Sequence, residues 1–193
     1  MKLLFASHNQ GKIEEVKSIL TDIDIVTPPD LEDDTEVEET GSTLQQNAFL
    51  KANHYYRSHK MATFADDTGL IVPVLKGAPG VRSARFAGEN ATYEDNNRLL
   101  LSKMANFKEE ERFAYFLTVI CYITQSGNVH YFRGELHGII DTEIRGDNGF
   151  GYDPLFRVRG MDKTLGELPP AFKNTISHRY QALAKFYDFL KGG

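Results

Sequence analysis

The stretch Lys2-Leu3-Leu4-Phe5-Ala6-Ser7-His8-Asn9-Gln10-Gly11-Lys12-Ile13 decides the class of fold. Its apolar part, Leu3 to Ala6, predicts a short buried strand, and the small polar residues after it predict a turn. Apolar residues then recur at helical spacing from Ile13 to Leu20, so the turn opens directly into a helix. Backbone N–H groups and the helix dipole favour an anion above such a turn, and Lys12 adds a full positive charge. The turn is neither a P-loop nor a Gly-x-Gly-x-x-Gly motif, and taken alone it is more typical of an ordinary turn with a solvated lysine.

The composition is that of an ordinary globular chain. With 193 residues, of which 41% are hydrophobic and 25% charged, we expect a single domain over residues 1–193, built as two lobes without a separable linker. No apolar run approaches the roughly 20 residues of a membrane span, and the one cysteine, Cys121, fits a buried thiol in a reducing cytoplasm. The net charge of −5 disfavours bulk binding of nucleic acid but allows a small anion held by local cations.

The remaining apolar patterns predict an α/β fold with a long mixed central sheet and flanking helices. Strands are expected at Ile23–Val26, Met61–Ala65, Arg112–Thr124, Val129–Leu136 and Leu155–Val158, and helices at 44–60, 92–105 and the C-terminal end. Thr43 with Gln46 fits a capping box for the first of these helices. Ser126-Gly127-Asn128 turns one strand into an antiparallel hairpin, so a purely parallel doubly wound sheet does not fit.

Two sets of acidic residues are candidates for binding a cation. Asp66-Asp67-Thr68-Gly69 follows an apolar strand, so two carboxylates are expected where the chain leaves the sheet. Adjacent ionised carboxylates are held most easily by a cation, typically Mg²⁺, although an Asx-turn at Asp66 is an equal alternative. Most of the acidic loop, Asp30 to Glu39, reads as solvated, but Glu38 and Glu39 adjoin a helix start and point to the same cation.

Two later segments carry possible ligand-binding groups. Lys173, His178 and Arg179 are donors gathered at the N-terminus of the last helix, where anions or carbonyl oxygens bind well, although a histidine in a loop is often incidental. Gly149-Phe150-Gly151-Tyr152-Asp153-Pro154 places glycines around two aromatic rings, as in a platform on which a planar base stacks. Tight corners use the same residues.

Taken together, these segments resemble the inosine triphosphate pyrophosphatase family, the house-cleaning enzymes that act on non-canonical purine nucleotides. The resemblance spans nearly the whole chain and rests on seven blocks in order: 7–12, Glu38-Glu39-Thr40-Gly41, 47–52, 65–70, 77–88, 149–154 and Ile176-Ser177-His178-Arg179. The family more often has Thr-Gly-Asn where this chain has Ser7-His8-Asn9, and often serine where Thr68 stands; both exchanges keep a hydroxyl.

The resemblance implies a long mixed sheet in two lobes around a nucleotide cleft, and a homodimer. It also implies Mg²⁺-dependent hydrolysis of ITP, dITP and XTP to the monophosphate and pyrophosphate. No nucleic-acid or membrane partner is expected, and the location implied is the cytoplasm. Hypoxanthine and xanthine carry a 6-carbonyl acceptor that suits donors from His178 and Arg179, whereas adenine presents an amine. This contrast does not reject GTP.

Carried onto this sequence, the resemblance gives each site residue a role. Asp67 is expected to be the general base. The metal ligands are expected to be Asp67, Glu38 and Glu39. Substrate binding is expected from Ser7, His8, Asn9, Gln10, Gly11, Lys12, Lys51, Thr68, Phe150, Gly151, Tyr152, Asp153, Lys173, His178 and Arg179. Two rivals remain: a haloacid-dehalogenase-type phosphomonoesterase, which favours Asp-x-Asp over adjacent aspartates, and a nucleotide sensor without turnover.

Overall fold

The structure is a computed structural model that describes residues 1–192. Its strands are β1 (Lys2–Phe5), β2 (Asp24–Val26), β3 (Thr63–Ile71), β4 (Pro79–Gly80), β5 (Phe113–Ile123), β6 (Val129–Ile140) and β7 (Phe156–Val158). The α-helices are α1 (Gln10–Ile19), α2 (Leu44–His59), α3 (Tyr93–Met104), α4 (Pro170–Ile176) and α5 (His178–Gly192). Short 3-10 helices lie at Pro28–Leu31, Pro73–Leu75, Ser83–Arg85, Glu109–Glu111, Asp153–Leu155 and Leu165–Glu167. Within these residues, no helix has both the length and the apolar character needed to cross a membrane.

The strands form one seven-stranded sheet in the order β2-β1-β3-β5-β6-β7, with β4 paired to β3. Strand β1 runs parallel to β2 and β3, whereas β7 runs antiparallel to β6 and β4 antiparallel to β3. The sheet is therefore mixed, which confirms the predicted α/β class. The turn at residues 124–128 joins β5 to β6 as a hairpin, as the sequence predicts.

The chain divides into two compact units. Unit 1 contains residues 1–67, 118–134 and 179 to the end of the described chain, and unit 2 contains 68–117 and 135–178. Strands β3, β5 and β6 contribute residues to both.

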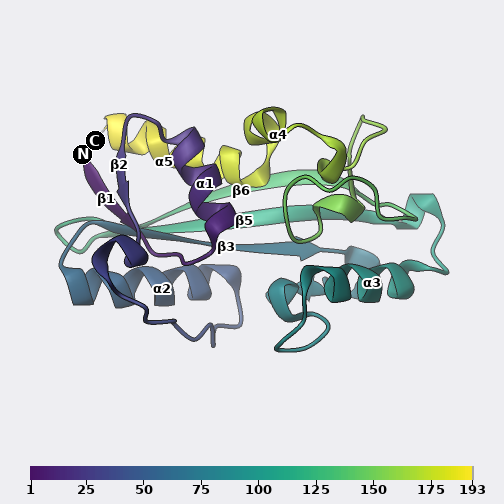
Figure 1. Cartoon of the computed structure of the whole chain (residues 1–193), viewed down its shortest axis with the longest axis horizontal. Helices are drawn as coiled ribbons and strands as arrows, with labels where there is room; N and C mark the ends of the chain where they lie inside the picture. The colour runs from purple at the N-terminus through teal and green to yellow at the C-terminus, as the bar shows by residue number, and fades with distance from the viewer. Residues whose placement is uncertain (193) are drawn as a thin grey trace. The chain divides into compact units, whose positions relative to one another are not determined.

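Unit 1 buries both faces of its strands under helices (Figure 1). Side chains alternate along β1, so Leu3 and Phe5 pack with α1 and α5, while Leu4 packs with α2 on the other face. The same alternation along β3 sends Phe64 to the first cluster and Ala65 to the second. A strand covered on both sides must be apolar throughout, which is why Leu3–Ala6 reads as a continuous apolar run.

Unit 2 has its own core around α3, β6 and β7, in which Leu100, Met104, Ile140 and Phe156 are fully buried. Arg112 lies inside it and donates to the Met104, Ile140 and Asp141 carbonyl oxygens at 2.6–2.7 Å. A buried guanidinium is tolerated because these carbonyls satisfy it, and it ties the end of α3 to β6.

The end predicted for the third strand is wrong. Strand β3 does not stop at Ala65 but continues through Asp66-Asp67-Thr68-Gly69 to Ile71, so both aspartates lie within a buried strand. The local sequence marks the carboxylates as strand breakers, but ion pairs and a hydrogen bond from distant residues satisfy them there. Asp66 pairs with lysine and arginine side chains, so the Asx-turn alternative is not what the structure has.

Other local differences have similar causes. Thr43 accepts from the Gln46 N–H, but the Gln46 side chain bonds Ser42 instead of Thr43, so only half of the capping box forms. Strand β6 extends to Ile140 beyond the predicted Leu136 because its end pairs with β7. The sequence prediction also missed α4, which has Pro170 as its first residue and contains Lys173.

Candidate active site

The turn between β1 and α1 presents the N-terminus of a helix that begins at Gln10. Asn9 is the N-cap and its Oδ1 accepts from the Lys12 backbone N–H at 3.1 Å, while Ser7 Oγ accepts from the Asn9 N–H at 3.2 Å. The first turn, Gln10-Gly11-Lys12, carries a cation and no carboxylate. The turn thus opens into a helix as predicted from the sequence, and no carboxylate in the first turn opposes the helix dipole, which favours an anion at this end.

A chain of buried ion pairs in unit 1 runs through Asp66. Lys12 Nζ lies 3.1 Å from Asp66 Oδ1, and Arg179 Nε lies 3.1 Å from Oδ2 of the same carboxylate. Arg179 also pairs through Nη1 with Glu15. Burial would raise the pKa of Asp66, but the charges of Lys12 and Arg179 outweigh it and hold the pKa well below its usual range. Asp66 is therefore ionised.

A second group surrounds Asp67. Lys51 Nζ lies 2.5 Å from Glu39 Oε1 and 3.8 Å from Asp67 Oδ1. On its other oxygen, Asp67 accepts from Asn47, with Nδ2 3.2 Å from Oδ2. Lys51 and Asn47 both project from α2, one turn apart, so the helix orients the carboxylate from one side.

The electrostatics of Asp67 differ from those of Asp66. Burial raises the pKa of Asp67, and Glu39 and Asp66 raise it further, so that the attraction of Lys51 does not bring it below its ordinary value. Burial alone would lower the pKa of Lys51, but Asp67 and Glu39 raise it instead, so this lysine keeps its charge. Two neighbouring carboxylates thus have their pKa values pushed apart, an arrangement typical of acid–base sites.

The oxygen donors around Asp67 fit Mg²⁺. In the ion-paired cluster of unit 1, the carboxylates of Glu15, Glu39, Asp66 and Asp67 outnumber the cations Lys12, Lys51 and Arg179 by one. Among residues 1–192 there is no group of three or more His, Cys, Asp or Glu side chains that could hold a metal by itself. Mg²⁺ commonly binds through one or two carboxylates plus substrate phosphates, so Asp67 and Glu39 are the candidate protein ligands.

The glycine-aromatic segment of unit 2 forms a tight corner around Asp153. Asp153 Oδ2 accepts from the Phe150 N–H at 3.0 Å and from Lys173 Nζ at 2.6 Å. Gly149 has φ +79°, and a Cβ there would lie 2.0 Å from Asp153 Oδ2, so only glycine fits. The half-buried Phe150 ring has Lys173 Nζ 4.8 Å from its centroid and Tyr93 beside it. A ring with a cation over one side is suited to stacking.

Other predicted residues of unit 2 are more enclosed. Tyr152 is buried and its hydroxyl donates to the Ser83 carbonyl at 2.8 Å. His178 is buried and stacks on Phe116 with centroids 4.6 Å apart. Asn97 donates to the Gly151 carbonyl at 2.7 Å, and Thr68 follows Asp67 within β3.

The structure thus brings the predicted residues together as two groups. Ser7–Lys12, Glu39, Lys51, Asp67 and Arg179 gather in unit 1, whereas Thr68, Phe150–Asp153, Lys173 and His178 belong to unit 2. Glu38 is exposed, while its neighbour Glu39 contacts Lys51. Sequence reasoning gave no role to Glu15 or Asn47. The spacing of Glu15, three residues after Lys12 on one helix face, is a signal that could have found it.

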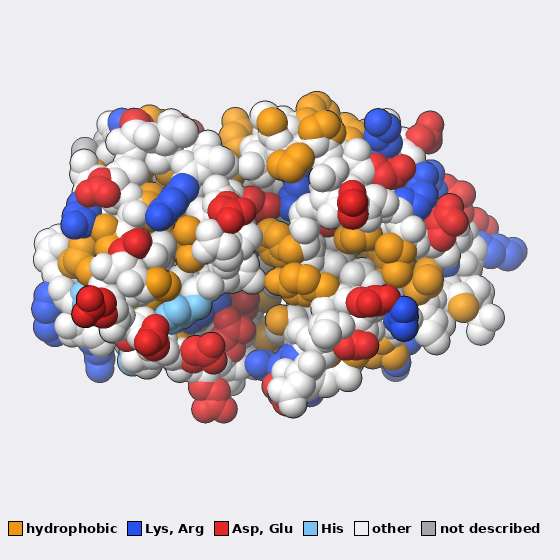
Figure 2. All heavy atoms as spheres, viewed as in Figure 1, with side chains coloured by type: hydrophobic (Ala, Val, Ile, Leu, Met, Phe, Trp, Pro, Cys, Tyr) orange, Lys and Arg blue, Asp and Glu red, His pale blue; other side chains and the backbone are white. Residues whose placement is uncertain are grey.

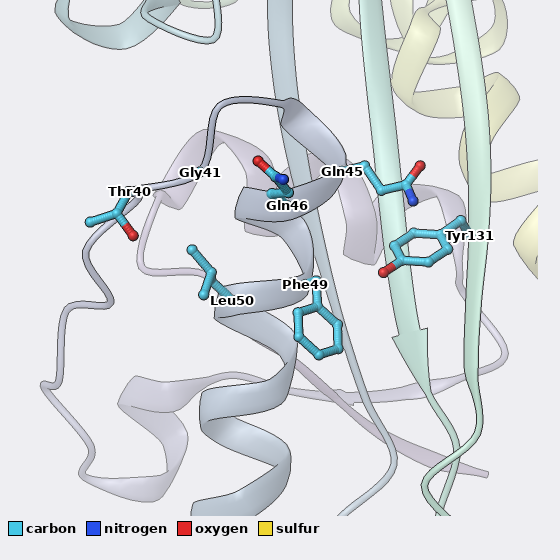
Figure 3. A pocket seen from close by; sticks show the side chains of 7 residues that line it. All are labelled: Thr40, Gly41, Gln45, Gln46, Phe49, Leu50 and Tyr131. Atoms are coloured by element: carbon cyan, nitrogen blue, oxygen red, sulfur yellow. The ribbon is translucent and has the colours of Figure 1, made fainter.

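A pocket of about 360 Å³ lies elsewhere in unit 1 (Figure 3). Gln46 and Leu50 of α2 face the loop of Thr40 and Gly41 on one side, and Tyr131 of β6 lies by Gln45 on the other. Asp67 and Lys12 do not line this hollow.

Comparison with known proteins gives consistent matches over the whole chain. A family model described as the Ham1 family matches residues 3–189. A dITP/XTP pyrophosphatase of Thermoanaerobacter pseudethanolicus is 45% identical over 98% of this chain and 96% of its own length, and one of Elusimicrobium minutum is 46% identical over 99% and 100%. The structure of the Staphylococcus aureus Ham1 protein superposes with a TM-score of 0.89 at 41% identity, covering 100% of this chain and 99% of that one.

Proposed function

The chain belongs to the Ham1 family, and we propose that it hydrolyses non-canonical purine nucleoside triphosphates to the monophosphate and pyrophosphate. The family resemblance predicted from the seven sequence blocks is confirmed. The named relatives act on dITP and XTP, and ITP shares the same 6-carbonyl base edge. This enzyme is therefore a nucleoside triphosphate pyrophosphatase.

The observation that carries the proposed mechanism is the environment of Asp67. Its carboxylate is buried, oriented by Asn47 and held near Lys51, and burial keeps its pKa raised. A general base works best when its pKa approaches the working pH, so these features favour Asp67 over the strongly acidic Asp66. Asp67 would accept a proton from water as the water oxygen bonds to the α-phosphorus and the bond to the bridging oxygen of pyrophosphate breaks.

We propose that Asp67 and Glu39 would hold Mg²⁺ together with the substrate phosphates. The bound ion would screen the triphosphate charge and stabilise the charge that develops on the leaving pyrophosphate. Glu39 is favoured over the exposed Glu38 because its carboxylate pairs with Lys51, which also lies near Asp67. Lys51, with a raised pKa, would remain a cation and bind phosphate oxygen.

The remaining site residues would position the nucleotide. Ser7, Asn9 and Lys12 would bind phosphate oxygens at the N-terminus of α1, and Lys173 would add a further cation. Phe150 would stack on the base, with donors from His178 and Arg179 toward the 6-carbonyl. The nucleotide cleft, the homodimer, the cytoplasmic location and the absence of nucleic-acid and membrane partners stay predictions.

The products formed from matched nucleotides test the proposal. We expect purified protein with Mg²⁺ to release pyrophosphate from XTP, dITP and ITP, with kcat/KM at least about 100-fold above that for ATP. One donor–donor mismatch with adenine costs ~1–3 kcal/mol, and the costs of two mismatches add. Release of orthophosphate would support the phosphomonoesterase rival instead. Tight binding of XTP without multiple turnover would support the sensor.

A further inference from the structure

We infer that His8 and His59 are positioning residues that fix the acidic loop, Asp30 to Glu39, and thereby hold Glu39 beside Asp67. This inference deepens the proposed function and rests on it, since it assigns Glu39 a role in binding the metal. Both histidines lie in unit 1, outside the buried charge cluster around Asp66 and Asp67.

His8 connects the candidate phosphate turn to the acidic loop. Its Nε2 lies 3.1 Å from the Asp33 carbonyl oxygen, and because a carbonyl only accepts, the imidazole must donate from Nε2. The ring is exposed, and the hydrogen bond turns it toward the loop. His8 would therefore act by joining two segments of the site, which differs from the direct substrate contact expected from the sequence.

His59 fixes the same residue from the end of α2. Its Nε2 lies 2.7 Å from Asp33 Oδ2, while Asp33 Oδ1 accepts from the Thr35 N–H at 3.0 Å. Hydrogen bonds from Thr35 and His59 lower the pKa of Asp33 to about 2, so this carboxylate is ionised and His59 donates to it. Asp33 thus accepts a hydrogen bond from His8 at its backbone carbonyl and another from His59 at its carboxylate.

Tyr55 adds a third contact from the same helix. Its ring is buried and stacks on His59, with centroids 6.2 Å apart and planes 11° apart. Burial, with Asp33 and Glu36 nearby, raises the pKa of Tyr55 to about 12, so the phenol keeps its proton and donates to the Thr35 carbonyl. The segment from Asp33 to Thr35 is therefore bound to α2 by hydrogen bonds from His59 and Tyr55, and the stack between these two rings lies within the helix itself.

The far end of the loop is also bound to α2, through Glu39 and Lys51 at 2.5 Å. Two fixed points on one helix limit the paths available to the residues between them. Figure 2 shows acidic side chains gathered over the segment that precedes α2, with a histidine side chain among them. Like charges in a loop repel one another and favour an extended, mobile chain. The hydrogen bond that His59 donates to Asp33 offsets this repulsion.

Amide hydrogen exchange in metal-free protein tests the positioning role without any catalysis. We expect His59→Ala to speed exchange across residues 34–40 by roughly 5-fold, since a partly exposed hydrogen bond to a charged group is lost. His8→Ala should speed it in the same segment. His59→Gln, which keeps a donor, should restore most of the protection.

His54→Ala is the matched control. His54 lies on α2 and contacts the Tyr55 ring edge-on at 5.0 Å, but among the described residues it makes no hydrogen bond to the acidic loop. Its exchange pattern should match the wild type. Equal acceleration in His54→Ala and His59→Ala would overturn the inference, because general loosening of α2 would then explain both.

The effect of losing His59 on the metal site is measured as a change in the Mg²⁺ concentration that the reaction requires. In His59→Ala, the Mg²⁺ concentration for half-maximal pyrophosphate release should rise about 5-fold, while kcat at saturating Mg²⁺ stays within about 2-fold. Faster exchange with an unchanged Mg²⁺ requirement would refute the link to Glu39. If the wild type fails to cut XTP or dITP, the proposed function fails, whereas unchanged exchange in His8→Ala and His59→Ala refutes this inference even in an active enzyme.

Discussion

Asn47 donates from its side-chain amide to Asp67, with Nδ2 3.2 Å from Oδ2, and accepts from the Gly41 N–H through Oδ1 at 2.8 Å. The side chain is fully buried and so has these partners in place of water. One amide therefore orients the candidate base and fixes the turn that precedes α2. We therefore propose that Asn47 contributes to both the catalytic site and the local structure.

Replacing Asn47 with alanine should impair both properties. The partly buried Gly41 N–H would lose its acceptor, so we expect a loss of about 1–3 kcal/mol in the free energy of unfolding. Asp67 would lose its orienting donor, and kcat should fall about 10-fold or more. Urea unfolding and steady-state kinetics measure the two effects. Gln46→Ala, one residue earlier and exposed, should change kcat less than 2-fold, and a similar loss there would contradict a specific role for Asn47.

Asp66 should make stability depend on pH. Although burial raises its pKa, Lys12 and Arg179 hold the folded-state pKa below the unfolded value, so Asp66 stabilises the fold fully above about pH 4. Asp66→Asn should therefore cost about 3–5 kcal/mol at pH 7, where it leaves buried cations without their partner. The difference from the wild type should shrink as pH falls below about 4. Urea unfolding at pH 7, 4 and 3 tests this, and a difference independent of pH would contradict it.

Removal of the metal should stop the reaction. We expect EDTA to abolish pyrophosphate release and Mg²⁺ to restore it. Glu39→Gln should raise the Mg²⁺ concentration for half-maximal rate about 10-fold, because one of two proposed carboxylate ligands becomes a weaker neutral donor. Glu38→Gln alters the exposed neighbour and should leave the requirement nearly unchanged. The reverse ranking of these two variants would show that Glu38 is the ligand.

Lys12 should contribute more to binding the phosphates of the substrate than to binding its purine base. In an Asp67→Asn background, where turnover is removed, Lys12→Ala should weaken XTP binding roughly 10- to 100-fold, as expected for the loss of a charge-assisted hydrogen bond. Binding of xanthosine, which lacks phosphates, should change little. Calorimetric titrations with both ligands make the comparison, and equal losses would argue against a phosphate contact at Lys12.

Most helices and strands could be predicted because apolar spacing and capping residues within each segment determine them. The apolar run at Leu3 and the helical spacing after Ile13 define β1 and α1, and the helix expected at 92–105 is present as α3 (Tyr93–Met104). Seven ordered motif blocks together identified the family, although the turn at Lys12 was ambiguous alone. Asn9 as N-cap also follows from its residue type.

Contacts between distant residues explain what the sequence did not show. Asp66 and Asp67 remain in a strand because Lys12, Lys51 and Arg179 reach them from other elements, a compensation that is not visible within 63–71. The sequence grouped Lys173, His178 and Arg179 by adjacency. In the structure, Lys173 instead forms an ion pair with Asp153 and Arg179 forms one with Asp66, since each buried charge pairs with an opposite charge.

The most direct test of the account is the turnover of XTP by Asp67→Asn, measured beside its binding of XTP. The amide keeps the shape of the side chain but cannot accept the proton from water. At saturating Mg²⁺, which offsets the loss of one metal ligand, we predict that XTP still binds within about 5-fold of the wild-type affinity while pyrophosphate release falls by about 10²–10⁴-fold. Turnover within a few fold of the wild type would contradict the assignment of Asp67 as the base and, with it, the proposed mechanism.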